Sequence, residues 1–159
     1  MPFDSQLQRK IMGQFATGVT VASTAIGEET WGMTATAVTS LSLDPPCVLL
    51  AVVKESQSHE KFKQAGCFVL NILSEKQREL SDRFAFSGPK DFSGINFTTA
   101  ETGAPIIPDS LGWVDCRLTE VLPGGDHDIF IGEIVAGDIS DGPPLLYFGG
   151  KYARLGDQL

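Results

Sequence analysis

Hydroxyl side chains gather in one stretch of the chain, between Trp31 and Pro46. They alternate with small apolar residues and the stretch ends at Asp-Pro-Pro, a pattern that predicts an extended strand. The hydroxyl residues are Thr34, Thr36, Thr39, Ser40 and Ser42. Small side chains leave room for a flat aromatic ligand, while hydroxyls and main-chain N–H groups can bind its polar edge and a phosphate. The alternative is an edge strand whose threonines only face solvent, because β-rich chains use threonine freely.

The overall charge limits the partners of such a site. The chain has 159 residues and a formal net charge of -8, which argues against nucleic acid and against a polybasic membrane contact. Its apolar runs, such as 47–53 and 67–73, are too short to span a bilayer, and the amino terminus lacks an export pattern. We therefore expect one domain over residues 1–159, located in the cytoplasm, that binds any anionic ligand through local donors.

The cysteine and histidine content predicts no metal site. Cys47, Cys67 and Cys116 are far apart and each lies in or beside an apolar run, so we expect buried thiols in a reducing compartment. His59 and His127 are the only histidines, and neither CxxC nor HxxxH spacing occurs.

Three segments carry helical patterns. Apolar residues at every fourth position predict a short amphipathic helix over 4–14. A second helix is expected over about 56–66, opened by a serine and closed by a glycine, and a third begins at the capping box formed by Ser74 and Gln77.

The remaining patterns predict strands. The expected strands cover 19–25, the hydroxyl-rich stretch, 47–53, 67–73, 112–122, 129–139 and 143–148 with the following tail. Residues 87–110 are expected to form a long loop with one short strand near 95–98. Because strands and helices do not alternate regularly, a mainly β fold is favoured, an antiparallel barrel with helices on its flank.

Five segments, in this order, resemble the flavin reductase-like domain. They are GMTATAVTSLSLDPP, CVLLAVVKESQSHEKF, GCFVLNILSEKQRELSDRFA, PGGDHDIFIGEI and PPLLYFGGKYARL. This family includes the small reductases of two-component flavin monooxygenases, such as the reductase component of 4-hydroxyphenylacetate 3-monooxygenase. The resemblance covers nearly the whole chain, and its strength lies in the order and spacing of segments that are individually unspecific. It implies an FMN-binding split barrel that forms homodimers with flavin at the subunit interface.

The resemblance also implies an activity: an NAD(P)H-dependent flavin reductase that reduces FMN or FAD and supplies the reduced flavin to a partner monooxygenase. Neither GxGxxG nor a P-loop occurs, so the nicotinamide of NADH or NADPH must lie directly on the flavin ring and pass hydride to its N5. No catalytic acid or base is then required. The alternatives are a flavoredoxin-like electron-transfer flavoprotein and a flavin-free interaction module. A hydrolase built from Ser40, Asp126 and His127 is disfavoured because no GxSxG is present.

The flavin contacts implied by the resemblance fall into three groups. The ring edge would be held by Thr34, Ala35, Thr36, Ala37, Ser40 and Leu41. The second wall and the phosphate contacts would come from Ala51, Val53, Lys54, Ser58, His59 and Phe62. Arg83 and Phe84 would approach from the third helix. The competing roles are strand packing for the first group, a solvated lysine at Lys54 and a core position for Phe84.

Two residues are implied at the nicotinamide site. His127 matches the histidine that lies by the dinucleotide in the family, and Tyr152 matches a carboxy-terminal tyrosine near the ligand groove. Without the resemblance, His127 between two aspartates would be read as a turn residue whose charged form its neighbours favour. Tyr152 could equally be an aromatic cap on the core.

Overall fold

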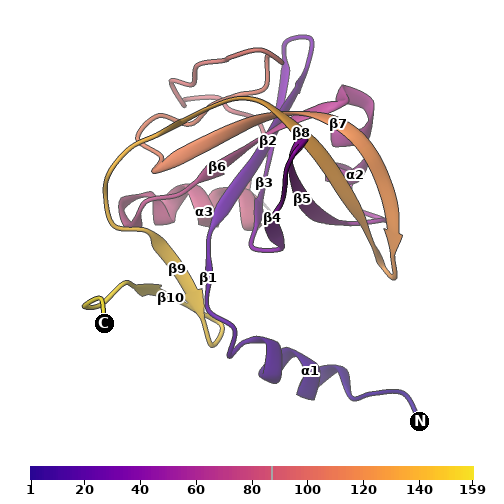
Figure 1. The fold of residues 1–159 in the computed structure, drawn as a ribbon, viewed down its shortest axis with the longest axis vertical. Coiled ribbons are helices and arrows are strands. Elements are labelled where there is room, and N and C mark those ends of the chain that lie inside the picture. The colour runs from indigo at the N-terminus through magenta and orange to yellow at the C-terminus, as the bar shows by residue number, and fades with distance from the viewer. Residues whose placement is uncertain (87) are drawn as a thin grey trace.

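A seven-stranded antiparallel sheet, in the order β3-β2-β6-β7-β8-β5-β4, forms the centre of the computed structural model, which describes residues 1–86 and 88–159 (Figure 1). The strands are β2 (Thr20–Ile26), β3 (Glu29–Ala35), β4 (Val38–Leu43), β5 (Pro46–Val53), β6 (Cys67–Ile72), β7 (Gly112–Gly124) and β8 (His127–Ile139). Helices flank this sheet. The expected class, mainly β with an antiparallel barrel and flanking helices, is confirmed.

The barrel closes within the hydroxyl-rich stretch. Strands β3 and β4 stand at opposite ends of the strand order, yet only Thr36 and Ala37 separate them in the chain. The main-chain N–H of Ala51 donates to the carbonyl oxygen of Ala37 over 3.0 Å beside this junction. The single strand expected over 31–46 is therefore two strands, because its first half pairs with β2 and its second half with β5. The junction leaves Thr36 and Ala37 exposed.

The barrel interior is filled by aromatic and aliphatic side chains, among them Leu50, Phe62, Phe68 and Phe130, each fully buried. Phe62 comes from helix α2 (Gln57–Ala65), which packs against β2, β3 and β5. Ser56 caps this helix by accepting from the N–H of His59. Gly66 ends it at a φ of +68°, a left-handed conformation that favours glycine.

Helix α3 (Arg78–Ala85) packs on the outer face of β3. It follows the short 3-10 helix η1 (Glu75–Gln77), whose Ser74–Gln77 capping box is present as predicted. Phe84 of α3 is buried in a second apolar cluster outside the barrel. A Cβ at Gly32 would lie 2.7 Å from the Phe84 ring, so glycine allows this close approach of helix and strand.

A smaller sheet and the first helix lie beside the barrel. Strands β1 (Thr17–Gly18), β9 (Leu145–Phe148) and β10 (Lys151–Arg154) form the sheet, with β9 in the middle. Helix α1 (Ser5–Met12) extends away from the rest of the molecule, and none of its side chains is buried (Figure 1). None of the helices in the described ranges is long and apolar enough to cross a membrane.

The long segment after α3 has little regular structure. The strand expected near 95–98 is reduced to a single bridge between Thr98 and Ile106, and Ser87, where the predicted loop begins, lies outside the described residues. Two buried side chains hold the segment: Asn71 accepts from the N–H of Ile107, and Asp115 accepts from the N–H of Thr102. These bonds anchor the second half of the segment to β6 and β7.

Candidate ligand-binding site

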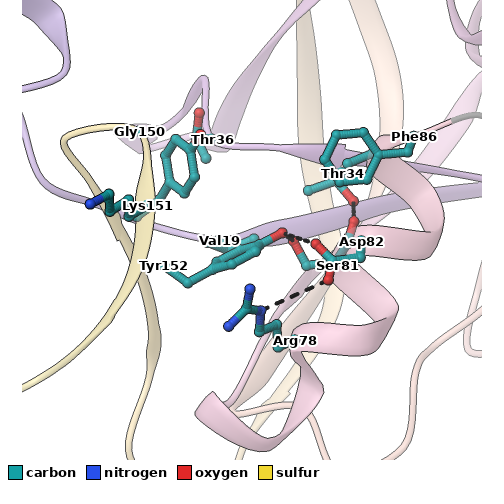
Figure 2. A pocket seen from close by; sticks show the side chains of 12 residues that line it. Val19, Thr34, Thr36, Arg78, Ser81, Asp82, Phe86, Gly150, Lys151 and Tyr152 are labelled. Atoms are coloured by element: carbon teal, nitrogen blue, oxygen red, sulfur yellow. Dashed lines mark hydrogen bonds and ion pairs between the residues drawn. The ribbon is translucent and has the colours of Figure 1, made fainter.

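A cavity of about 790 Å³ lies outside the barrel, between the end of β3, helix α3 and the β9–β10 hairpin (Figure 2). Its lining consists of Val19, Thr34, Thr36, Arg78, Ser81, Asp82, Ala85, Phe86, Tyr147, Gly150, Lys151 and Tyr152. This volume is in the range of pockets that hold cofactors. The cavity therefore borders the point at which the barrel closes.

Hydroxyl groups fix the walls of the cavity to one another. The Oγ1 of Thr34 donates to the carbonyl oxygen of Ser81 over 2.6 Å, which ties β3 to α3. The Oγ of Ser81 in turn lies 2.7 Å from the hydroxyl of Tyr152, which ties α3 to β10. Thr36 lines the cavity at the exposed junction of the barrel. Hydrogen bonds thus connect β3, α3 and β10, which are distant in sequence.

Aromatic rings form much of the remaining wall. The chain has two tyrosines, and both line the cavity. Their ring centroids are 5.6 Å apart in an edge-to-face arrangement. Phe86 is largely exposed and lines the cavity from the end of α3, where the Nζ of Lys90 donates to the carbonyl oxygen of Phe86. Such a lining suits a flat aromatic ligand.

The hydroxyl of Tyr152 also donates to Oδ1 of Asp82 over 2.8 Å. Burial raises the pKa of Tyr152 above its ordinary value of 10.0; the hydrogen bond to Asp82 acts in the same direction, while that from Ser81 opposes it. Tyr152 is therefore a neutral hydrogen-bond donor at physiological pH.

Two cations line the cavity, Arg78 and Lys151. The guanidinium carbon of Arg78 lies 4.8 Å from the centroid of the Tyr152 ring, and its Nε is 3.8 Å from Oδ2 of Asp82. In a chain with a net charge of -8, these side chains supply the local positive charge that an anionic ligand needs.

A second cluster of charged groups lies where β5 ends and β8 begins. Nε2 of His59 is 2.7 Å from Oδ2 of Asp128, and Nζ of Lys54 is 3.8 Å from Oδ1 of the same carboxylate. The His59 ring packs edge-on against Phe130 and the side chain is only 12% exposed. The sequence did not predict Asp128 at a site. It lies near Lys54 because the pairing of β5 with β8 places Asp128 opposite Val52.

His127 is the first residue of β8, where it pairs with Val53, and is not part of a turn. Its Nδ1 lies 2.7 Å from Oδ1 of Asp126, and 39% of its side chain is exposed. The hydrogen bond from His127 and then the charge of His127 lower the pKa of Asp126. The imidazole is thus bonded at Nδ1 and partly exposed to solvent.

Several residues implied by the resemblance lie elsewhere. Ala35, Ser58, Phe62 and Phe84 are buried, and the Oγ of Ser58 accepts from Nε1 of Trp31 over 2.9 Å. Arg83 turns away from the cavity, and its Nη2 donates to the carbonyl oxygens of Asp91 and Ser93.

The other implied positions surround the barrel closure. Ser40 and Leu41 are exposed on β4, Ala37 is exposed at the junction and Ala51 is half-buried beside it, while Val53 is exposed at the end of β5. Of the sixteen implied positions, Thr34, Thr36 and Tyr152 line the cavity.

Two local signals mark several of the cavity residues that were not predicted at the site. Arg78, Ser81 and Asp82 are three and four residues apart, so they share one face of the predicted third helix. Tyr147 and Lys151 flank a Gly-Gly turn whose two residues have positive φ. Neither signal indicates by itself that the two segments meet.

Comparison with known proteins identifies the family of the chain. The family model described as flavin reductase like domain matches residues 12–156. The chain belongs to this family, as its sequence predicted.

Three relatives illustrate the match. The chain is 40% identical over 148 residues to the reductase component of 4-hydroxyphenylacetate 3-monooxygenase from Thermus thermophilus, covering 92% of this chain and 94% of the relative. It is 37% identical over 155 residues to the FMN reductase (NADH) SmoA of Agrobacterium fabrum, covering 98% of this chain and 88% of the relative. One solved structure is that of the NADH:FAD oxidoreductase SgcE6 of Streptomyces globisporus in complex with NAD and FAD fragments. It superposes on this chain with a TM-score of 0.90 at 32% identity, covering 98% of this chain and 97% of that one.

Proposed function

We propose that this protein is an NAD(P)H:flavin oxidoreductase that reduces FMN or FAD and supplies the reduced flavin to a partner monooxygenase. The observation that carries the proposal is the cavity beside the barrel closure, which joins hydroxyls, aromatic rings and cations in one space of about 790 Å³. The relatives named as flavin reductases and monooxygenase reductase components support it.

The lining of this cavity fits a flavin. Thr36 and the main chain around it can bind the polar edge of the ring, while Phe86 and Tyr147 offer apolar surface to its plane. Arg78 and Lys151 supply positive charge for a phosphate. The other family-implied positions at the barrel closure, Ala37, Ser40 and Ala51, border the same region of the chain.

When bound, the flavin supplies the redox chemistry, because its N5 accepts the hydride of a reduced nicotinamide. The residues of this chain bind and orient the two rings, and no side chain has to exchange a proton in this role. His127 is suited to hold the dinucleotide, because Asp126 binds Nδ1 and the side chain remains partly exposed. His59 has less freedom, since Asp128 and Phe130 both pack against it.

The protein acts as a homodimer in this proposal. The edge of β4 that faces away from β5 has no paired strand among the described residues, and Leu41 and Leu43 of this strand are exposed. An unpaired, apolar strand edge is a surface that proteins normally cover. A second copy would cover it and place β4 residues such as Ser40 beside a ligand.

The proposal also covers the whole chain and its cellular setting. Residues 1–159 form one flavin reductase-like domain, located in the cytoplasm, and the reduced flavin reaches the monooxygenase by diffusion. Three free, buried cysteines suit a reducing compartment.

Flavin reduction can be assayed with both flavins and both dinucleotides in variants that fill the cavity. Ala85 lines the cavity and is exposed, so Ala85→Trp fills it without entering the core. The matched control is Ala100→Trp, since Ala100 is exposed in a loop outside the cavity lining. We expect Ala85→Trp to lose flavin affinity and reductase activity and Ala100→Trp to retain both. Tight flavin binding without reduction by either dinucleotide would instead indicate the electron-transfer alternative.

A further inference from the structure

Arg78 is oriented by its neighbours and keeps most of its donors free. Its guanidinium stacks on the Tyr152 ring at 4.8 Å, and its Nε faces Asp82 at 3.8 Å, an ion-pair distance too long for a hydrogen bond. Figure 2 shows the two terminal nitrogens on the side of the guanidinium away from Asp82. Within residues 1–86 and 88–159, no hydrogen bond from this guanidinium is formed.

Each of two neighbouring arginines lacks one of these features, although the Arg78 side chain is itself 65% exposed. Arg83 is occupied by the carbonyl oxygens of Asp91 and Ser93. Arg154 has an 84% exposed side chain, lies 3.9 Å from a carboxylate oxygen of Glu75, and does not line the cavity. Arg78 thus combines a set orientation, available donors and a place in the cavity.

We infer that Arg78 binds a phosphate ester of the ligand in this cavity, with Lys151 as the second cation. The inference rests on the proposed function and assigns a part of the same site. A planar guanidinium presents paired N–H donors that match two phosphate oxygens. Asp82 faces Nε of Arg78 through Oδ2, while its Oδ1 accepts from Tyr152, so the terminal nitrogens of the guanidinium keep their donors for a phosphate. The phosphate is either that of FMN or the 2′-phosphate of NADPH, which share the same recognition chemistry.

The first measurement is the dissociation constant of FMN and of riboflavin, which differ only by the phosphate. If Arg78 binds the flavin phosphate, Arg78→Ala weakens FMN binding by about tenfold, as expected for a charge-assisted hydrogen bond, and leaves riboflavin binding unchanged. Arg78→Lys keeps the charge without the planar fork and recovers part of the loss. The matched control, Arg154→Ala, changes neither constant.

The second measurement is the ratio of the KM values for NADH and NADPH. If Arg78 binds the 2′-phosphate, Arg78→Ala raises the KM for NADPH by about tenfold, with the KM for NADH unchanged. The inference is overturned if Arg78→Ala alters neither the FMN-to-riboflavin ratio nor the NADPH-to-NADH ratio, or if it weakens both members of each pair equally. A wild-type protein that binds no flavin would overturn the proposed function itself and this inference with it, so the two failures are distinguishable.

Discussion

The hydroxyl of Tyr152 donates to Oδ1 of Asp82 over 2.8 Å, although the two residues are 70 positions apart in the sequence. This bond joins the last strand, β10, to helix α3 and so closes one side of the cavity. The same ring carries the guanidinium of Arg78 on its face. The carboxy-terminal hairpin is therefore a wall of the candidate site and not merely a tail.

Replacing Tyr152 with phenylalanine removes this bond but keeps the ring. We expect the free energy of unfolding, measured by urea denaturation near neutral pH, to fall by about 1 kcal/mol. The pKa of Tyr152 is raised by folding, so its contribution to stability is present below about pH 10 and is lost as the pH rises further. Tyr152→Phe should therefore lose less stability than the wild type on going to alkaline pH. Equal losses in the two proteins would contradict the raised pKa of Tyr152.

Replacing His127 with alanine tests the proposed dinucleotide contact. The exposed imidazole edge contributes about one hydrogen bond, so we expect KM for the reduced dinucleotide to rise about fivefold, with flavin affinity almost unchanged. As a structural control, the pKa of Asp126, followed by NMR, should return toward 3.8 in the variant. A loss of flavin binding would reject this role for His127.

The thiols should be unreactive in the folded protein. Burial raises the pKa of Cys116 to about 12, and the negative charge of Asp115 adds to this effect. Cys47 and Cys67 are also buried. Because the thiolate is the reactive form, a thiol-specific reagent should label none of the three at neutral pH until denaturant is added. Rapid labelling of Cys116 in the native protein would show that the barrel opens more readily than its packing indicates.

Close packing inside the barrel makes Gly132 sensitive to any side chain. A Cβ there would lie 2.5 Å from Cζ of Phe68 and 2.8 Å from Cβ of Cys116. We expect Gly132→Ala to lower the free energy of unfolding by about 1 to 3 kcal/mol. Gly18→Ala is the control, because a Cβ at Gly18 meets nothing within 4 Å. Two variants of equal stability would mean that the core around Phe68 is looser than described.

Local patterns predicted the elements of this fold well. The capping box at Ser74 and Gln77, the glycine end of α2 at Gly66 and the amphipathic pattern of the first helix are confirmed. These features depend on residues within a few positions of each other, so a single sequence carries them. The first helix ends at Met12, slightly before the end of the expected range 4–14.

Long-range contacts account for what sequence reasoning could not predict. The break between β3 and β4 occurs because Val38 pairs with Leu50 while Thr34 pairs with Val21, and no local signal at Thr36 reports that change of partner. Likewise, Asp82 and Tyr152 form one frame only because the β9–β10 hairpin packs beside α3. Thr34, Thr36 and Tyr152, which the resemblance implied, do line the cavity, whereas their neighbours in space could not be predicted.

A crystal structure of the protein with FMN tests the central claim most directly. We predict the isoalloxazine ring in the cavity bounded by Thr36, Phe86 and Tyr147, with one face left open for the nicotinamide. A flavin bound at a different place on the molecule, or a cavity filled by its own side chains in the presence of saturating FMN, would contradict the account.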